Sequence, residues 1–300
     1  MYNMYGCPMH YGAGDKGLIY SLDFLNQYYD LHIPIVPEIT VPEKNLPNLK
    51  NLNSVVTTCY AIAKFQHRII VHGDTPLFIA GDHSAAIGSI SGTSARYENL
   101  GLIWIDAQPD INTDKTTVTG NIHGMSVAAL LGIGEKSLTK VFKPGPKLKA
   151  ENIVMIGLRD IDRPEQVLLD DLKIKYYTYD QVCCIGLDTC INAAIHYLSH
   201  LDAIHLSFAL DSLDPAIIPG VSNHVPRGFD VGDAHHMITA FLKELPIAAM
   251  DIVEFNVVHD VEHRTSDFVD QLIRWILRSN ETLPSKKDTT YVESPKEILV

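Results

Sequence analysis

The segment Ser207-Phe208-Ala209-Leu210-Asp211-Ser212-Leu213-Asp214-Pro215 joins an apolar run to two aspartates. The run that leads into it, 203–208, is mostly apolar, as expected of a strand buried in a parallel sheet. Carboxylates at the end of such a strand are well placed to bind a metal ion. A small apolar residue, Ala209, stands where this pattern would otherwise place a carboxylate. We therefore interpret the segment as the metal-binding end of a buried strand in which one ligand position has changed.

A second segment has the same form. Gly101-Leu102-Ile103-Trp104-Ile105-Asp106 reads as a strand and continues into Ala107-Gln108-Pro109-Asp110.

Other apolar runs predict strands at 76–80, 152–157 and 248–253, and helical patterns lie at 84–95, 123–132, 164–172, 188–199, 231–243 and 264–278. This alternation predicts one α/β domain over residues 1–300, with a single mostly parallel sheet flanked by helices. The polar residues from about Ser279 onward are expected to form a C-terminal arm.

The net charge and the cysteine content limit the partners and the cellular location that we expect for this protein. Lys and Arg number 24 against 36 Asp and Glu, which gives a net charge of −12. Such a chain repels phosphate groups, so nucleic acid and anionic membranes are not expected partners. No apolar run approaches the ~20 residues that span a bilayer, and the start has no signal-peptide pattern. The five cysteines form no paired framework, which indicates reduced thiols and a cytoplasmic protein.

Polar residues follow each of the predicted strands. They occur at 81–84, 106–110, 159–162 and 211–214, and at Glu254. Because the carboxyl ends of parallel strands meet at one edge of a sheet, these residues should form one acidic site. The alternative is that they cap the helices that follow. Capping would explain Ser84 and Asp162, but it would not explain paired aspartates beside a strand-end His.

Taken in order, these strand ends resemble the ureohydrolase family of arginase, agmatinase and their relatives. Gly81–Ser89 is similar to the first metal motif of the family, Trp104–Thr113 to the second (D-A-H-x-D) and Ser207–Pro215 to the third (S-x-D-x-D-x-x-D-P). Thr119-Gly120-Asn121-Ile122-His123-Gly124 is most similar to arginases. The resemblance extends from about Gly6 to Leu277, and it implies a three-layer sandwich with about eight strands in the sheet.

The resemblance implies a site for two Mn²⁺ ions that share a hydroxide able to attack a guanidinium carbon. The metal ligands that this chain retains, matched by position, are His83, Asp106, Asp110 and Asp211. Gln108 replaces a family His, and Ala209 replaces an Asp that bridges both ions. Because Ala209 offers no donor atom, we expect no tightly bound metal and at most one weakly bound Mn²⁺.

The resemblance also implies an amino acid pocket. The positions that would bind the substrate are Asn112, Thr119 and Asn121 for its carboxylate, and Asp162 and Glu165 near its α-amino group. His123 matches a His proposed as a proton shuttle, and Glu254 matches an acid that pairs with the guanidinium. For His123 the alternative is a helix-start or core histidine.

Two further departures concern the pocket loop and the assembly. His224, in Val221–Pro226, is bulkier than the family residue, and we expect it to fill the pocket or to donate to the carboxylates. Gly232-Asp233 stands where an Arg-Glu pair links arginase trimers. The resemblance still implies a homotrimer, or a mixed oligomer with an active paralogue.

Three functions fit these residues. The leading expectation is a catalytically impaired or inactive arginase-like protein that binds L-arginine or a related amino acid in a regulatory role. The second is an active Mn²⁺-dependent arginase that hydrolyses L-arginine to L-ornithine and urea with altered metal ligands. The third is a hydrolase or lyase that uses His123 and Glu254 without metal. The first leads because a missing bridging ligand leaves the nucleophile neither generated nor positioned.

Overall fold

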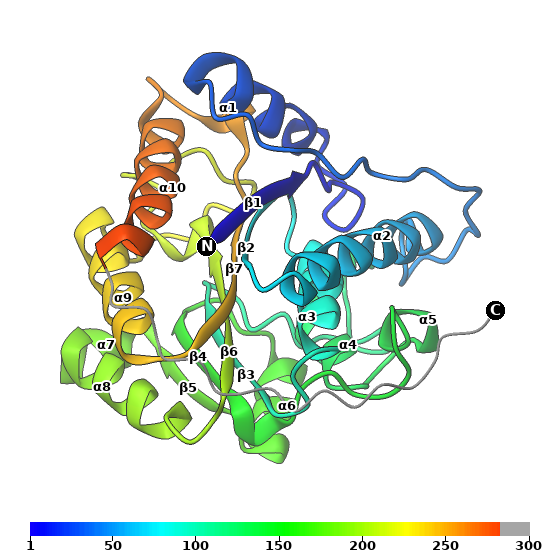
Figure 1. The fold of residues 1–300 in the computed structure, drawn as a ribbon. Helices are drawn as coiled ribbons and strands as arrows, with labels where there is room; N and C mark the ends of the chain where they lie inside the picture. Colours follow the sequence, from blue (N-terminus) through cyan, green and yellow to red (C-terminus); the bar gives the residue numbers. More distant parts are fainter. Residues whose placement is uncertain (283–300) are drawn as a thin grey trace, which may run out of the picture.

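The computed structural model describes residues 1–282 of the chain. Its seven strands are β1 (Tyr2–Cys7), β2 (Thr75–Ala80), β3 (Leu100–Ile105), β4 (Ile153–Leu158), β5 (Lys175–Thr178), β6 (Ala203–Ala209) and β7 (Ile247–Val253). They form one sheet in the order β1-β2-β7-β6-β3-β4-β5, and every neighbouring pair is parallel (Figure 1). The predicted parallel sheet flanked by helices is confirmed, with seven strands where about eight were expected.

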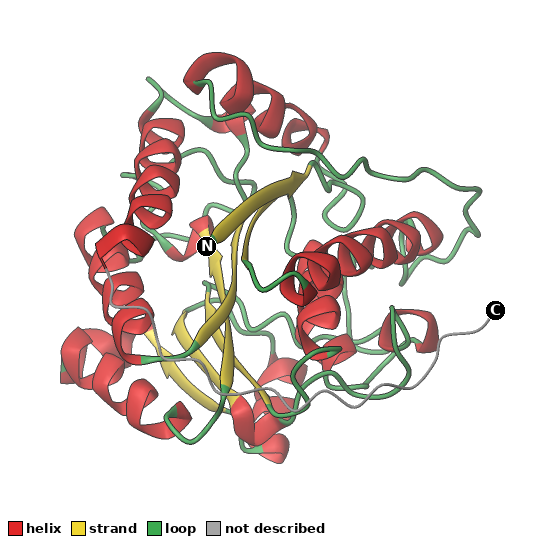
Figure 2. Ribbon diagram, viewed as in Figure 1, coloured by secondary structure: helices red, strands yellow, loops and turns green. Residues whose placement is uncertain are grey.

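Ten α-helices cover this sheet in the described residues. They are α1 (Ser21–Tyr29), α2 (Leu52–Val71), α3 (Ala85–Ser94), α4 (Ser126–Leu130), α5 (Lys136–Thr139), α6 (Arg163–Leu172), α7 (Tyr179–Ile185), α8 (Leu187–Leu198), α9 (Val231–Glu244) and α10 (Arg264–Thr282). Short 3-10 turns are η1 (Lys16–Tyr20), η2 (His123–Met125), η3 (Ala150–Asn152), η4 (Leu210–Ser212) and η5 (Val257–His259). Apolar residues of α1 and α7–α10 pack on one face of the sheet, and those of α2–α4 and α6 pack on the other (Figure 2).

The sequence pattern identified the five central strands but missed the two edge strands and the helices α1, α2, α5 and α7. β1 and β5 lie at the ends of the strand order, where each pairs with only one other strand of the described sheet, although β1 also forms an isolated bridge between Gly6 and Ile35. β5 has only four residues and is partly exposed, so it lacks a long apolar run. Residues 279–282 of the C-terminal arm expected from Ser279 belong to α10, which continues to Thr282. The rest of that expected arm, 283–300, lies outside the described residues.

Helix α3 is buried along its whole length, and two glycines explain how it fits. A Cβ on Gly88 would lie 2.6 Å from the carbonyl oxygen of Cys59, and one on Gly92 would lie 2.5 Å from that of Ala63. Both carbonyls belong to α2, so the glycines allow the two helices to approach closely. This close contact fixes α3, whose N-terminus follows the strand-end residues 81–84.

A chain of buried polar side chains crosses the core below the site. The pairs are Tyr5 Oη to Gln66 Oε1 (2.6 Å), Gln66 Nε2 to Thr93 Oγ1 (3.0 Å), Thr93 Oγ1 to His205 Nδ1 (3.1 Å), His205 Nε2 to Asp251 Oδ2 (2.9 Å) and Ser89 Oγ to Asp251 Oδ2 (2.6 Å). Buried polar groups are costly unless they are paired, so this row of side chains fixes the helices and strands that it joins in one arrangement.

No helix among residues 1–282 is both long enough and apolar enough to cross a membrane.

Candidate metal and substrate site

The strand ends meet at one edge of the sheet, around a cavity of about 460 Å³. Its lining includes the predicted residues Gln108, Asp110, Asn112, Thr119, Asn121, His123, Asp162, Glu165 and His224. The other predicted residues are also buried. His83, Asp106 and Glu254 are linked to this group by the ion pairs given below, and Asp211 lies where the charge of Asp106 acts on it. The expectation of one acidic site at the carboxyl edge therefore agrees with the positions of these residues.

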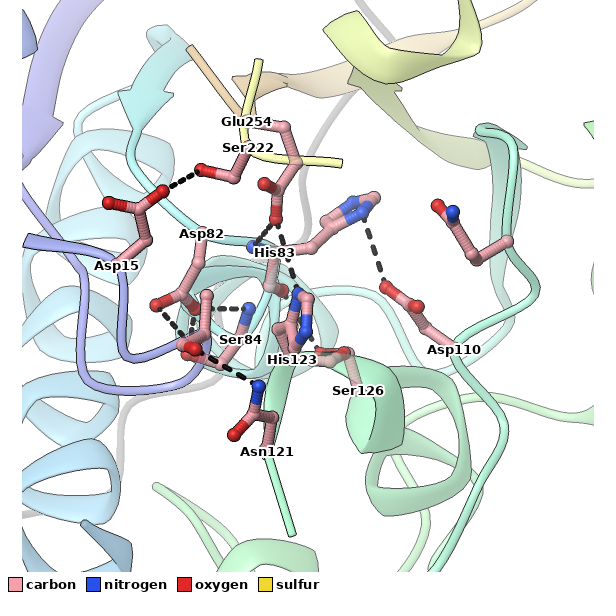
Figure 3. Close-up of polar contacts among 12 residues, drawn as sticks. Asp15, Asp82, His83, Ser84, Asp110, Asn121, His123, Ser126, Ser222 and Glu254 are labelled. Atoms are coloured by element: carbon pink, nitrogen blue, oxygen red, sulfur yellow. Dashed lines mark hydrogen bonds and ion pairs between the residues drawn. The ribbon is translucent and has the colours of Figure 1, made fainter. Parts of the chain in front are cut away.

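Three buried side chains, His83, Asp106 and Asp110, form a group able to hold a cation. Their potential ligand atoms all lie within 4.8 Å of one another. His83 Nδ1 is 2.6 Å from Asp106 Oδ2. The same nitrogen is 3.4 Å from Asp110 Oδ2 (Figure 3). Although this nitrogen is so close to a carboxylate, it has no hydrogen-bond partner of suitable geometry among the described residues. The nitrogen and the carboxylate oxygens thus lie side by side, as donor atoms around a shared ion do.

The ring of His83 is held from three directions. It stacks on Trp104 with ring centres 3.7 Å apart and planes inclined by 4°. Its Nε2 is 2.8 Å from Ser207 Oγ, and its backbone N–H donates to Glu254 Oε1 at 2.7 Å. These contacts orient Nδ1 toward the carboxylates.

The charged form of the site's aspartates is strongly disfavoured by burial and by neighbouring negative charge. Burial, followed by the charge of Asp106, raises the pKa of Asp110 and of Asp211 well above the usual range of an aspartate. Asp211 Oδ1 is buried and has no hydrogen-bond partner in the described chain. Buried acceptors without partners are rare and unfavourable, so a cation in this place would remove a real cost.

The two replaced ligand positions differ in what they offer. The side chain of Gln108 donates from Nε2 to Asp160 Oδ2 at 3.2 Å, on the exposed side of the cavity. Its backbone N–H donates to Asp106 Oδ1 at 2.8 Å and so helps to orient a retained carboxylate. Ala209 is fully buried and belongs to an apolar cluster with Val253, where it supplies no donor atom.

His123 and Glu254 lie together beside the metal-capable group. His123 Nδ1 is 3.6 Å from Glu254 Oε1 (Figure 3). Burial lowers the pKa of His123, but the hydrogen bond and charge of Glu254 outweigh it and leave the pKa above its ordinary value. The second oxygen of Glu254, Oε2, is buried without a partner in the described chain. His123 is the first residue of η2, as the helix-start alternative expected, and it also lines the cavity.

The start of α6 and the loop after β3 form the side of the cavity that was expected to bind the amino acid group of a substrate. Asp162 and Glu165 form a capping box, in which the Asp162 N–H donates to Glu165 Oε2 at 3.0 Å. The N–H of Ile111 donates to the other oxygen of Glu165 at 3.1 Å, and Asn112 Nδ2 donates to Asp162 Oδ2 at 3.1 Å. Burial raises the pKa of Glu165 to about 7. Capping and pocket lining are thus combined in the same two acids.

Two predicted roles differ from the contacts observed. Ser84 does not cap α3, since its hydroxyl donates to Asp82 Oδ1 instead. His224 lines the cavity but does not donate to the acidic cluster, because its Nε2 donates to the carbonyl of Pro219 at 2.8 Å.

An N-terminal loop, residues 10–15, forms part of the site and was not predicted. The carbonyl of Ala13 accepts from Asn121 Nδ2 at 3.0 Å, and its N–H donates to Asp82 Oδ2 at 3.0 Å. Asp15 Oδ2 accepts from Ser222 Oγ at 2.9 Å (Figure 3). It also accepts from Asn256 Nδ2 at 2.9 Å. Because these partners are far apart in the sequence, no local pattern reveals them.

A parallel α/β sheet with His and Asp ligands at successive strand ends defines a metal-dependent hydrolase of the ureohydrolase type. The model of the Arginase family matches residues 20–278, and the chain belongs to that family. It is 38% identical to the arginase of Bacillus subtilis (strain 168) over 234 residues, which cover 78% of this chain and 79% of the relative.

Solved structures agree with this assignment. The arginase from Bacillus caldovelox superposes with a TM-score of 0.82 at 32% identity, over 91% of this chain and 96% of that one. Entamoeba histolytica arginase, solved in complex with L-ornithine, gives a TM-score of 0.82 at 27% identity, over 90% and 96% of the two chains.

These findings overturn the leading functional expectation. We expected an impaired or inactive relative, but relatives that are 33–38% identical over most of the chain are named arginase, and nothing in the comparisons indicates impairment. The expectation of no tightly bound metal is also wrong. The chain belongs to a family for which manganese is expected, and His83, Asp106 and Asp110 form a buried group able to hold a cation.

Proposed function

We propose that this protein is an active manganese-dependent arginase that hydrolyses L-arginine to L-ornithine and urea, with altered residues at two ligand positions. One observation carries the proposal. A buried group of metal-capable side chains lies next to two carboxylate oxygens, Asp211 Oδ1 and Glu254 Oε2, that have no partner among the described residues. The Asp211 oxygen, together with the metal-capable group, fits a cation, and the Glu254 oxygen fits a guanidinium.

The donor set fits manganese. Imidazole nitrogen and carboxylate oxygen are both suitable ligands for Mn²⁺. His83, Asp106 and Asp110 would hold the ion, and Asp211 would contribute the oxygen that is otherwise unpaired. A manganese ion in this place supplies Lewis-acid activation of water. The raised pKa values of Asp110 and Asp211 support this assignment, since a nearby positive charge would favour the ionised form of both carboxylates.

The chain's own residues would bind and protonate the substrate. Glu254 Oε1 is occupied by the N–H of His83, whereas Oε2 is available to accept from the planar N–H groups of a guanidinium. Attack of water on the guanidinium carbon, with cleavage of the bond from this carbon to the Nε of L-arginine, produces urea and an amine that must gain a proton. His123 lines the cavity and has a raised pKa, so it is suited to donate that proton.

The far end of the cavity would bind the amino acid group. We assign the carboxylate to Asn112, Thr119 and Asn121 and the ammonium to Asp162 and Glu165. All five side chains line the same cavity as His123. L-Arginine has a guanidinium at one end and this zwitterionic group at the other, so it matches the two ends of the cavity.

The direct test combines product and metal analysis. Purified protein loaded with Mn²⁺ should release equal amounts of urea and L-ornithine from L-arginine, and elemental analysis should find stoichiometric manganese. Asp110→Asn should lose both the metal and the turnover. Absence of urea from metal-loaded wild-type protein would disprove the proposal.

Assembly and location complete the proposal. We propose a homotrimer in the cytoplasm, formed by single-domain subunits, with no nucleic acid or membrane partner. Gly232-Asp233 cannot form the Arg-Glu link of the family, since Gly232 has no side chain and Asp233 belongs to the capping box of α9 with Asp230. Other contacts would therefore hold the subunits together. Sedimentation velocity should give a mass three times that of the chain.

A further inference from the structure

Arg159 directly follows β4, and its guanidinium is surrounded by backbone carbonyl oxygens. Its acceptors are Asp211 O (2.7 Å), Leu213 O (3.1 Å), Ser212 O (3.2 Å), Val225 O (3.1 Å), Pro226 O (3.3 Å) and Gly157 O (3.5 Å). No carboxylate in the described part of the chain forms an ion pair with it. Five of these six oxygens belong to two other segments, so the side chain joins three parts of the fold.

Both of those segments carry residues of the site. The first is the end of β6, where Asp211 holds its unpaired carboxylate oxygen. The second, which we call the pocket wall, comprises residues 222–225 and lines the cavity. Two backbone hydrogen bonds also join the flanks of these segments, from Asp214 N to Phe229 O (2.9 Å) and from Phe229 N to Ser212 O (3.2 Å). Among the contacts that join these two segments, only that of Arg159 with Val225 reaches the pocket wall itself. Ser222 and His224 of the wall bond instead to Asp15 and to the carbonyl of Pro219.

The chemistry of the contact requires arginine. A guanidinium presents five N–H donors in a rigid plane, whereas a lysine ammonium presents three donors at a single point. The acceptors are divided among three nitrogens, because Nε donates to Pro226 O, Nη1 to Ser212 O, and Nη2 to carbonyls of both segments. Lysine could supply the charge but could not satisfy carbonyls on both sides at once.

We propose that Arg159 is a positioning residue that holds the Asp211 segment and the pocket wall at a fixed separation, so that metal affinity and substrate affinity depend on it together. The part of this proposal that concerns affinity rests on the proposed function. The part that concerns the two segments rests on the contacts alone.

The test compares Arg159→Lys, which keeps the charge, with Arg159→Met, which removes it. Arg227→Lys is the matched control, because Arg227 follows the pocket wall but forms an exposed pair with Asp180. Hydrogen exchange measured by mass spectrometry should show faster exchange at 210–214 and 222–229 together in both Arg159 variants. The Mn²⁺ dissociation constant and the KM for L-arginine should each rise by about 10- to 100-fold, as is typical when an outer partner of a metal site is lost. The control should match the wild type.

Two outcomes would overturn the proposal. One is exchange at both segments that remains at the wild-type rate in Arg159→Lys. The other is full rescue of both affinities by lysine, which would show that charge rather than the fork geometry acts. If the wild-type protein releases no urea, the proposed function fails, but the exchange rates still decide the role of Arg159.

Discussion

Ser207 Oγ lies 2.8 Å from His83 Nε2, on the side of the ring opposite the carboxylates. Ser207 comes from the end of β6, and His83 follows β2, so the contact crosses the sheet. Because the Ser207 hydroxyl is the partner of Nε2, the other ring nitrogen, Nδ1, is left to face Asp106 and Asp110, where the ion would bind.

Removal of that hydroxyl should weaken metal binding. We expect Ser207→Ala to raise the Mn²⁺ dissociation constant by about 10- to 100-fold, since the ring loses a contact that orients it. Isothermal titration with Mn²⁺ measures this directly. Ser199→Ala is a suitable control, because Ser199 only bonds the carbonyl of His196 on the surface. Equal affinities in the two variants would show that stacking on Trp104 suffices.

Replacement of His123 should slow turnover more than it weakens binding. His123→Asn is expected to lower kcat by about 10²- to 10⁴-fold, the usual contribution of a positioned proton donor, with little change in KM. Its metal content should match the wild type, because His123 is not part of the metal-capable group. Steady-state urea release and elemental analysis give the two quantities. A variant with normal kcat would remove His123 from the mechanism.

Glu165 should make stability depend on pH. Burial raises its pKa to about 7 from the 4.5 of an unfolded glutamate, so the folded state binds more protons between these values. The free energy of unfolding should therefore fall as the pH rises from about 4.5 to about 7, where the buried group loses its proton. Glu165→Gln removes this component, and its stability should change less over that window. Urea unfolding at pH 5 and pH 8 tests the sign, with Glu151→Gln as a control on an exposed acid.

The two replaced ligand positions predict a metal-dependent change in stability. Ala209 is fully buried among apolar residues, near carboxylates whose pKa values are already raised. Without metal, Gln108→His with Ala209→Asp should lower the melting temperature, since an unpaired buried charge is unfavourable. With saturating Mn²⁺ the order should reverse, because the added donors strengthen ion binding to the folded state. Thermal unfolding with and without Mn²⁺ provides the comparison, and a loss of stability in both conditions would show that the space around Ala209 cannot admit a ligand.

Much of the site could be predicted because it lies at the ends of buried strands. Long apolar runs identify β3, β6 and β7, and the first polar residues after them point to Asp106, Asp211 and Glu254. Edge strands carry weaker signals, which is why β1 and β5 were missed. Arg159 acts through backbone carbonyls, and any residue presents a carbonyl, so its partners leave no trace in the sequence. The functional error had a different cause. The two changed ligand positions, 108 and 209, were given more weight than the four retained ones. Three of the retained residues, His83, Asp106 and Asp110, form the buried metal-capable group.

The pairing of Asp15 with Asn256 joins two residues that are 241 positions apart. Asp15 also accepts a hydrogen bond from Ser222, which lies 207 positions away and lines the cavity. Residues from early and late parts of the chain thus hold one lining residue in place. Contacts of such long sequence separation form late, because the intervening chain must first be ordered. A growing polypeptide could therefore bury most of its sheet and still lack a finished cavity. Activity should appear only after β7 has left the ribosome and closed against the N-terminal loop.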